Sequence, residues 1–294
     1  MNDMDLDETI KSVFGNNCHI LARRHVSGGD INRAYALELS DGSKVFMKAN
    51  GKENADFFRA EADGLAAIRS TKTVRVPEVI AYGADDNESF LLLEYIESGT
   101  GGRASSAELG EDLAQLHMAD ANSFVKDGRF GFLTDNYAGA TRQVNTPKEK
   151  WTDFYIECRL MPQFDLANRF FNREEHKTID VFLNRIDRYI LEPEHPSLVH
   201  GDLWAGNYMI DKDGHPWLID PAAYVGHAEA DLAMTELFGG FDRTFYDAYR
   251  STAGIDPGYK DRKDLYNLYH LLNHLNLFGD GYLYSVKSII RRYM

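Results

Sequence analysis

The sequence predicts an α+β fold in two lobes, an antiparallel-sheet lobe over residues 1–97 and a mainly helical lobe over residues 98–294. Three observations support this division. Strand-length runs with turn signals dominate the first lobe, and apolar residues at helical spacing dominate the second. A single hairpin pattern, over residues 208–219, interrupts the helical half. With 294 residues, the chain is long enough to bury a sizeable core.

The bulk composition is that of a globular enzyme. The 46 acidic and 32 basic residues give a net charge of −14, which disfavours nucleic-acid binding, because that binding depends on Lys and Arg at phosphates. No apolar run approaches the roughly 20 residues of a membrane helix, and the N-terminus is acidic where a signal peptide would be basic. We therefore expect a cytoplasmic protein with no membrane partner. Cys18 and Cys158 stand far apart without metal-ligand patterning and are interpreted as ordinary thiols.

The first lobe is expected to begin with a short amphipathic helix, since apolar residues fall on one face at helical spacing over 6–14. Strand patterns follow, and Asp41-Gly42 is a hairpin turn signal between two of them. A helical pattern then separates these strands from two more. The expected strands are 19–26, 34–39, 44–49, 76–81 and 90–96, and the expected helix is 54–70.

The second lobe opens with the glycine-rich stretch 98–103, which we interpret as a linker because a helix follows it directly. Beyond this linker, apolar residues recur at helical spacing in most segments. The expected helices are 104–118, 150–171, 174–191, 229–238, 243–252, 262–278 and 281–292.

The stretch 198–210 presents a carboxylate, Asp202, and a carboxamide, Asn207, between apolar flanks. The turn residues 211–214 predict a hairpin that brings both side chains to the same end of a small sheet as a second carboxylate, Asp220. Two carboxylates and an amide oxygen suit Mg²⁺, with water and phosphate completing its octahedron. The order Asp-x-x-x-x-Asn, followed by a further Asp, is typical of the catalytic loop of kinases.

With this spacing, and with His-Gly-Asp over 200–202, the chain resembles the small-molecule branch of the protein-kinase-like fold, which includes aminoglycoside phosphotransferases and choline kinases. The residues at 220–222 and 226–234 most resemble the sequence of the fructosamine kinase family. This resemblance covers nearly the whole chain. It implies that Asp202 is the catalytic base and that Asn207 and Asp220 hold Mg²⁺.

The resemblance assigns the nucleotide half of the site to the first lobe. Gly28 and Gly29, between the first two strands, would form a lid whose N–H groups face phosphate oxygens, although an isolated Gly-Gly pair is more often a turn. Lys48 ends a strand and Glu61 lies near the centre of the next helix, in the order of the ion pair that directs a lysine to ATP. An isolated strand-end lysine would ordinarily be an exposed one.

The apolar strand that ends in Glu94, Tyr95 and Ile96 occupies the place of the hinge in the resembling fold. The backbone of these three residues would hydrogen-bond the edge of adenine. A buried strand that continues into a loop describes the same residues equally well, so the role of this segment in binding the nucleotide is inferred from its position alone.

Residues 130–145 form a long segment that is rich in turn formers, and segments of this length in compact domains usually have a function. The segment strongly resembles a signature of fructosamine kinases, which implies that Asn136 and Gln143 line the acceptor-sugar pocket together with Trp204. An ordered loop that braces the large lobe is an equally weighted alternative. His270 and His274 are interpreted as packing or solvent-facing residues, because a zinc-protease motif would place Glu where Leu271 stands.

The resemblance implies an ATP- and Mg²⁺-dependent phosphotransferase that phosphorylates a sugar hydroxyl of a ketoamine adduct, such as fructosamine or ribulosamine, in deglycation repair. Two alternatives stay open. One is a kinase for another small hydroxyl compound, such as an aminoglycoside, choline or a thio-sugar. The other is a nucleotide-binding module without catalysis. The sequence leaves open whether the natural ketoamine is free or protein-bound and whether the protein forms oligomers.

Overall fold

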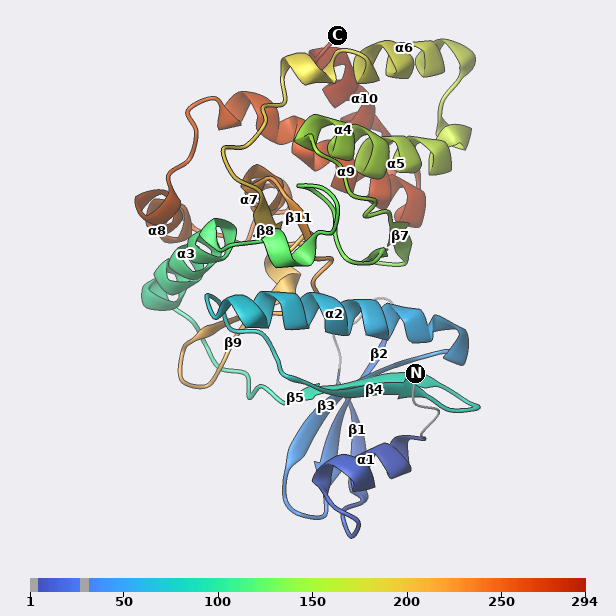
Figure 1. The fold of residues 1–294 in the computed structure, drawn as a ribbon, viewed down its shortest axis with the longest axis vertical. Coiled ribbons are helices and arrows are strands. Elements are labelled where there is room, and N and C mark those ends of the chain that lie inside the picture. Colours follow the sequence, from blue (N-terminus) through green and yellow to red (C-terminus); the bar gives the residue numbers. More distant parts are fainter. Residues whose placement is uncertain (1–4, 27–31) are drawn as a thin grey trace.

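The computed structural model of the chain describes residues 5–26 and 32–294. A five-stranded sheet lies at one end of the long axis and a helical part at the other (Figure 1). The α+β class predicted from the sequence is therefore confirmed. Residue 97, where the two lobes were predicted to meet, lies in the connection between the last strand of this sheet and the first long helix of the helical part.

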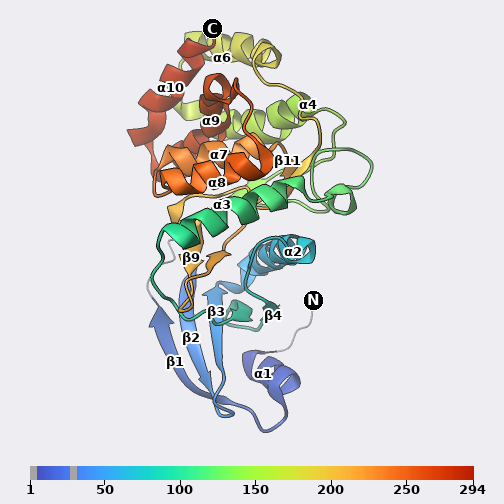
Figure 2. The same cartoon turned by 90° about the vertical axis from the view of Figure 1, so that its left-hand side faces the viewer.

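The N-terminal sheet is antiparallel throughout and has the strand order β1-β2-β3-β5-β4. Helix α1 (Leu6–Phe14) covers one face of the sheet, and α2 (Ala55–Thr71) lies between the other face and the helical part (Figures 1 and 2). The strands are β1 (Ile20–Val26), β2 (Arg33–Leu39), β3 (Lys44–Asn50), β4 (Val79–Ala84) and β5 (Ser89–Glu94).

The alternation of β3 decides which of its side chains face the helical part. Val45, Met47 and Ala49 are buried in the cluster under α1. Because successive side chains of a strand point to opposite faces, Lys48 points to the α2 side. The antiparallel register sets Lys48 opposite Leu91 of β5. The lysine is therefore presented to the space between the sheet and the helical part.

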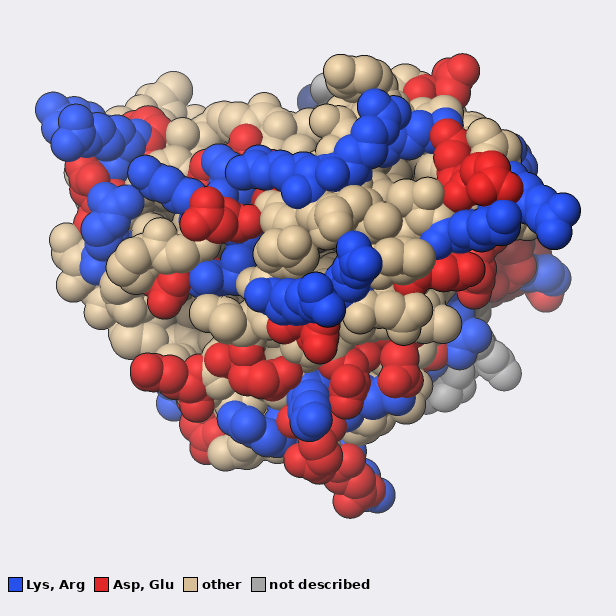
Figure 3. Space-filling view, turned by 90° about the horizontal axis from the view of Figure 1, so that it is seen from above, with Lys and Arg blue, Asp and Glu red and all other residues tan. Residues whose placement is uncertain are grey.

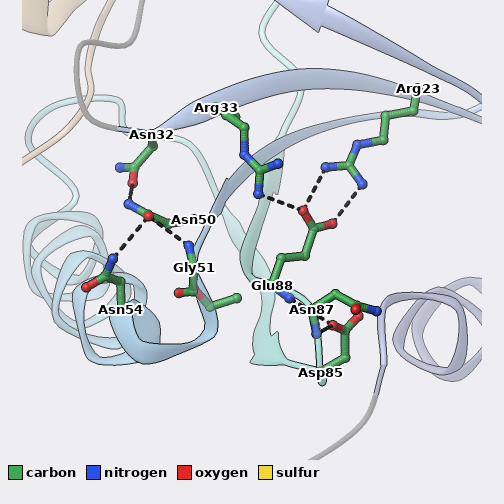
Figure 4. A network of polar contacts seen from close by, with 10 residues as sticks. Arg23, Asn32, Arg33, Asn50, Gly51, Asn54, Asp85, Asn87 and Glu88 are labelled. Atoms are coloured by element: carbon green, nitrogen blue, oxygen red, sulfur yellow. Dashed lines mark hydrogen bonds and ion pairs between the residues drawn. The ribbon is translucent and has the colours of Figure 1, made fainter.

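Two polar clusters connect the sheet to its loops at the edge shown in Figure 4. Arg23 of β1 and Arg33 of β2 both donate to Glu88, which lies in the turn between β4 and β5. Asn50, at the end of β3, donates to Asn32 Oδ1 at 2.7 Å. These contacts tie β1 and β2 to the β4–β5 turn and to the end of β3.

The helical part contains six helices of ten or more residues and a broken helical stretch between two of them. The longer helices are α3 (Arg103–Met118), α6 (Arg173–Leu183), α7 (Ala228–Leu237), α8 (Arg243–Ala253), α9 (Tyr259–Phe278) and α10 (Leu283–Arg292). The stretch predicted as one helix over 150–171 consists of α4 (Trp151–Tyr155), a π-helical turn (Ile156–Leu160) and α5 (Met161–Leu166). The helix predicted over 174–191 ends at Leu183, because the chain turns there into a short 3₁₀ segment (Ile186–Arg188).

Three short strand pairs support the loops of the helical part. The predicted hairpin is confirmed as β9 (Tyr208–Ile210) and β10 (Pro216–Leu218). Two further pairs were not predicted, since strands of three residues are too short to show a period. These are β6 (Asn136–Ala138) with β7 (Thr141–Gln143), and β8 (Ser197–Val199) with β11 (Tyr224–Gly226).

Backbone hydrogen bonds attach the β9–β10 hairpin to the connection between the lobes. The Gly99 N–H donates to the Ile210 carbonyl at 2.9 Å, and the Lys212 N–H donates to the Glu97 carbonyl at 2.8 Å. A third bond, from the Leu218 N–H to the Arg75 carbonyl, joins the hairpin to the loop before β4. The hairpin, and with it the residues just beyond its strands, therefore lies directly beside the sheet.

The distal end of the helical part mixes charges of both signs. Figure 3, which looks onto that end, shows Lys and Arg interleaved with Asp and Glu. Ion pairs such as Lys287 with Glu175 and Lys177 with Glu174 lie on α10 and α6. Within residues 5–26 and 32–294, we find no helix with the length and apolar character needed to cross a membrane.

Candidate active site

The predicted lysine–glutamate pair is present between β3 and α2. Lys48 Nζ donates to Glu61 Oε1 at 2.7 Å and to Asp220 Oδ1 at 2.6 Å. Only 8% of the Lys48 side chain is exposed. Burial alone would lower the pKa of Lys48, but the carboxylates of Asp220 and Glu61 outweigh burial and hold this pKa above its ordinary value. Lys48 is therefore a fixed positive charge that links the two lobes.

Asp220 lies just beyond β10 in an exposed position that the backbone holds in place. Its φ of 57° falls in the left-handed region, where few residues other than glycine are found. The preceding residue, Ile219, donates its N–H to the Asn207 carbonyl at 3.0 Å. This bond brings Asp220 beside the loop that follows β8, although thirteen positions separate Asn207 from Asp220 in the sequence.

Asp202 and Asn207 are connected within that loop. Asn207 Nδ2 donates to the Asp202 carbonyl at 2.8 Å and to Asp202 Oδ2 at 3.2 Å. Burial, and then the neighbouring charge of Asp220, raises the pKa of Asp202 to about 7. About a quarter of the Asp202 side chain is nevertheless exposed. The carboxylate is therefore close to water and has a pKa suited to proton transfer near neutral pH.

The donor set fits a divalent cation that completes its coordination with other ligands. Among the described residues, no group of three or more His, Cys, Asp and Glu side chains could hold a metal ion. The Asn207 amide uses its nitrogen for Asp202, which leaves its oxygen available, and Asp220 supplies a carboxylate oxygen. Mg²⁺ commonly binds one or two carboxylates and takes its remaining oxygens from water and phosphates. Asn207 and Asp220 therefore suit Mg²⁺ that arrives with a phosphorylated ligand.

A buried carboxylate that the sequence did not predict holds this loop from behind. The N–H groups of His200 and Gly201 donate to the two oxygens of Asp231 at 2.6 and 2.8 Å. His117 lies 3.1 Å from the same carboxylate. Burial would raise the pKa of Asp231, but its hydrogen bond with His117 and its other contacts lower it below the ordinary value. Asp231 is thus a buried anion that fixes the backbone immediately before Asp202.

The glycine of the His-Gly-Asp sequence is required by its surroundings. Gly201 has a φ of 83°, and a Cβ there would lie 2.1 Å from the Ala222 carbonyl oxygen. His200 is fully buried, and its Nε2 donates to the Ile219 carbonyl at 2.9 Å. The catalytic loop and the segment around Asp220 therefore touch on both sides of Gly201, so the three predicted polar residues depend on one another for their placement.

The structure places Asn136 and Gln143 differently from the acceptor-pocket positions expected for them. Each is 2% exposed, and they lie opposite each other in the β6–β7 pair. Asn136 Nδ2 donates to the Ala223 carbonyl at 2.7 Å, and Gln143 Nε2 donates to the Ala222 carbonyl at 3.0 Å. The Tyr269 hydroxyl donates to Gln143 Oε1. Because their polar atoms are already paired, these two residues brace the segment that follows Asp220, as the alternative reading of this loop described.

Trp204 and His270 lie beside the predicted base. Trp204 is 38% exposed, and a Cβ on Gly206 would lie 2.3 Å from the Trp204 ring, so the ring lies over its own loop. His270 Nδ1 is 4.0 Å from Asp202 Oδ1. Burial, and then His274, lowers the pKa of His270 to about 3, so it is a neutral neighbour of Asp202 at physiological pH. The spacing of His270 and His274 in the sequence did not indicate that His270 would lie beside Asp202.

The remaining residues predicted to bind the nucleotide are only partly described. Gly28 and Gly29 lie outside the described residues. Glu94 ends β5 and Tyr95 and Ile96 follow it, all half-buried. Glu94 pairs with Val45 across the ladder, three residues from Lys48. The segment thus lies on the strand next to the lysine, which is consistent with the predicted hinge position and leaves its contact with adenine a prediction.

Comparison with known proteins finds relatives named as kinases that match nearly the whole chain. A family model described as fructosamine kinase matches residues 3–294. A Synechocystis protein named "Probable ketoamine kinase" is 42% identical over 97% of this chain and 94% of its own length. The chloroplastic protein-ribulosamine 3-kinase of Arabidopsis thaliana is 40% identical over 92% of this chain and 81% of its own length.

Solved structures share this arrangement of sheet and helices. A "Putative fructosamine-3-kinase" from Haemophilus somnus superposes with a TM-score of 0.87 at 27% identity, covering 98% of this chain and 96% of that one. An aminoglycoside phosphotransferase in complex with AMP-PNP and hygromycin B superposes with a TM-score of 0.66 at 15% identity, covering 98% and 96% of the two chains. The second likeness shows that the fold is protein-kinase-like.

The site therefore combines a buried cation, an exposed carboxylate with a free amide oxygen beside it, and a second carboxylate whose pKa is about 7. The cation can compensate phosphate charge, the oxygens can hold a divalent metal, and the second carboxylate can accept a proton. These are the groups that phosphoryl transfer to a hydroxyl requires.

Proposed function

Because the chain belongs to the fructosamine kinase family, we propose that it transfers the γ-phosphoryl group of ATP to a sugar hydroxyl of a ketoamine adduct. The observation that supports this most is the joint contact of Lys48 with Glu61 and Asp220, because it aligns the phosphate-binding cation with the metal-binding carboxylate. Relatives named ketoamine kinase and protein-ribulosamine 3-kinase support the acceptor class and point to the 3-hydroxyl.

In the proposed reaction, the acceptor oxygen attacks the γ-phosphorus and Asp202 accepts the hydroxyl proton. The bond between the γ-phosphorus and the bridging oxygen breaks, and ADP leaves. With a pKa raised to about 7, Asp202 is ionised in about half of the molecules at pH 7 and is more basic than an ordinary aspartate. Asn207 orients it through the bond to Oδ2. Lys48 neutralises charge on the transferred group.

Asn207 and Asp220 would hold Mg²⁺, which when bound supplies charge compensation at the phosphate oxygens. The positive charge of Lys48 already contacts Asp220 in the described structure. Glu61 accepts a second hydrogen bond from the same ammonium, so Lys48 would stay beside the phosphates if Asp220 bound the metal. The glycines at 28 and 29 would cover the nucleotide, as the resemblance implies.

The decisive experiment supplies the purified protein with ATP, Mg²⁺ and a small ketoamine, and measures ADP release and the phosphorylated sugar. We expect ketoamine-dependent turnover. Asp202→Ala should abolish turnover while nucleotide binding, measured by calorimetry, stays close to that of the wild type. Glu111→Ala, an exposed carboxylate on α3, is the matched control and should keep full activity.

Two outcomes would contradict the proposal. If the protein phosphorylated amino alcohols or aminoglycosides but no ketoamine, it would be a kinase for another class of acceptor. Nucleotide binding without phosphorylation of any acceptor would make the protein a binding module. A comparison of free and protein-bound ketoamines in the same assay would then define the natural form of the acceptor. The cytoplasmic location expected from the sequence stays a prediction.

A further inference from the structure

A row of aromatic residues leads away from the predicted base along one side of α9. His270, His274 and Phe278 are spaced by four residues and therefore share one face of the helix. The His274 ring stacks on Phe238 with a centroid distance of 4.8 Å and an interplanar angle of 29°. It meets Phe278 edge-on at 5.2 Å. The row thus extends from His270, beside Asp202, to the surface.

Two of these rings are open to solvent. Phe278 is 59% exposed and Phe238 is 41% exposed. Trp204, next to the catalytic loop, adds a third ring at 38%. Exposed aromatic residues close together at the rim of a site are more often binding groups than packing groups. We define these three residues as the aromatic rim.

The turn that follows Phe238 packs Gly240 against Ala205 of the catalytic loop. Gly239 and Gly240 have φ values of 75° and 97°, which lie in the left-handed region. A Cβ on Gly240 would lie 2.3 Å from the Ala205 Cβ, so only glycine allows this approach. The Tyr208 hydroxyl donates to the Gly240 carbonyl at 3.4 Å. Since Ala205 follows Trp204, the turn joins Phe238 to the same edge of the site.

The charge at the aromatic rim favours a cation. Helix α7 ends at Leu237, so its unpaired carbonyls and the negative end of its dipole lie next to Phe238. The faces of aromatic rings also attract cations. Burial lowers the pKa of His274, so this ring carries no competing charge at neutral pH. Its Nδ1 is buried without a hydrogen-bond partner among the described residues, so one acceptor or donor there is unused.

The dimensions match the amine side of a ketoamine. Four single bonds of about 1.5 Å separate the 3-oxygen from the amine nitrogen, which therefore lies about 5 Å from the reacting oxygen. At about 1.5 Å per residue, α9 advances about 6 Å from His270 to His274. A sugar hydroxyl at Asp202 would thus place the secondary ammonium near His274, and the carrier chain beyond it would lie over Phe238 and Phe278.

We propose that Trp204, Phe238 and Phe278 form a subsite for the amine side of the acceptor, its secondary ammonium and the aliphatic chain that carries it. This proposal rests on the function proposed above. It assigns a specificity role to residues outside the phosphoryl-transfer groups, and it makes the cationic amine, rather than the sugar alone, a recognised feature. The rim separates ketoamines from neutral sugars with the same hydroxyls.

The test compares two acceptors, a ketoamine on a short lysine peptide and its ether analogue, in which oxygen replaces the amine nitrogen. Wild-type protein is assayed first, and absence of turnover on the ketoamine would reject the proposed function before the rim is tested. We expect Phe238→Ala and Phe278→Ala to lower kcat/KM for the ketoamine about 3- to 30-fold, mainly through KM. The ether analogue should lose less than the ketoamine, because only its chain contacts the rings, and the KM for ATP should change little.

Two further variants complete the test. Tyr82→Ala removes a ring that is 37% exposed on β4, distant from the rim, and should leave both acceptors unchanged. Phe278→Tyr keeps an aromatic face and should retain the wild-type preference for the amine. Equal losses for the amine and the ether, or no loss for either, would overturn the subsite. Thermal unfolding of each variant separates a loss of folding from a loss of recognition.

Discussion

Lys48 Nζ lies 2.6 Å from Asp220 Oδ1, although 172 positions separate the two residues in the sequence. Lys48 comes from the central part of the sheet and Asp220 from the loop after the small hairpin, so this contact closes the space between the lobes. Glu61 accepts a second hydrogen bond from the same ammonium, so carboxylates from α2 and from the loop after β10 both hold the lysine. The predictions below follow from this arrangement and from the residues that support it.

Lys48→Met should lower kcat by about 10²- to 10³-fold, because the variant removes a preorganised positive charge from the phosphates. The KM for ATP should rise as well. Steady-state kinetics at saturating ketoamine measures both. Lys52→Met, which changes an exposed lysine in the segment before α2, should leave them unaltered. A Lys48→Met protein with normal kcat would contradict the role of this lysine.

Asp231→Asn should destabilise the protein by about 3 kcal/mol, because it leaves the buried N–H groups of His200 and Gly201 imperfectly paired. Activity should fall by more than the loss of stability explains, because Asp231 holds the backbone of the two residues that precede Asp202. Urea unfolding and kinetics on the folded fraction distinguish the two effects. Asp264→Asn, in a partly exposed ion pair with Arg292, is the control and should cost less than about 1 kcal/mol.

Gln143→Ala should reduce stability by about 2 kcal/mol and lower kcat, with the KM for the ketoamine almost unchanged. The reason is that Gln143 holds the Ala222 carbonyl, and through it the segment that carries Asp220. Arg142→Ala, whose side chain is 71% exposed in the same strand pair, should be neutral. A raised ketoamine KM at full stability would instead support the direct acceptor contact that the sequence predicted.

Asp112→Asn should raise the melting temperature above pH 6 and have little effect at pH 4. Burial, followed by the charge of Glu108, raises the pKa of Asp112 to about 6. Because the unfolded chain holds this carboxyl at its lower ordinary pKa, the native state loses stability as the pH rises from about 4 to 6. Thermal unfolding across pH 4 to 8 measures this. Glu111→Gln on the exposed side of α3 should show a much weaker dependence, because the charge of Glu111 raises the pKa of Asp112 less than burial and Glu108 do; an equal effect of both variants would contradict the prediction.

The sequence was sufficient for the fold class, the hairpin and the identity of the polar groups, because each depends on local patterns. Alternating strands with turn signals predicted β1, β2 and β3 to within a residue or two. The spacing from Asp202 to Asn207 and the hairpin before Asp220 together indicated the catalytic loop. The order of Lys48 and Glu61 on consecutive elements, together with the resemblance to the kinase-like fold, predicted their ion pair.

Other features escaped prediction because they involve contacts between distant segments. Asp231 gave no signal, since an acidic residue in the first turn of a helix is ordinary, and only the packing of α7 under β8 makes it an anchor. The burial of Asn136 and Gln143 was likewise invisible, because polar residues in a turn-rich segment are expected at the surface. The exposure of Phe238, just after α7, and of Phe278, at the end of α9, also depends on which surfaces other segments leave uncovered.

The sequence by itself determined which chemical groups this protein has and in what local order, since backbone preferences and side-chain periodicity act over a few residues. The tertiary structure alone decided which of those groups face one another. It joined Lys48 to Asp220, set His270 beside Asp202, and used Asn136 and Gln143 as braces. The physical reason is that burial and hydrogen-bond pairing are settled only when distant segments pack together.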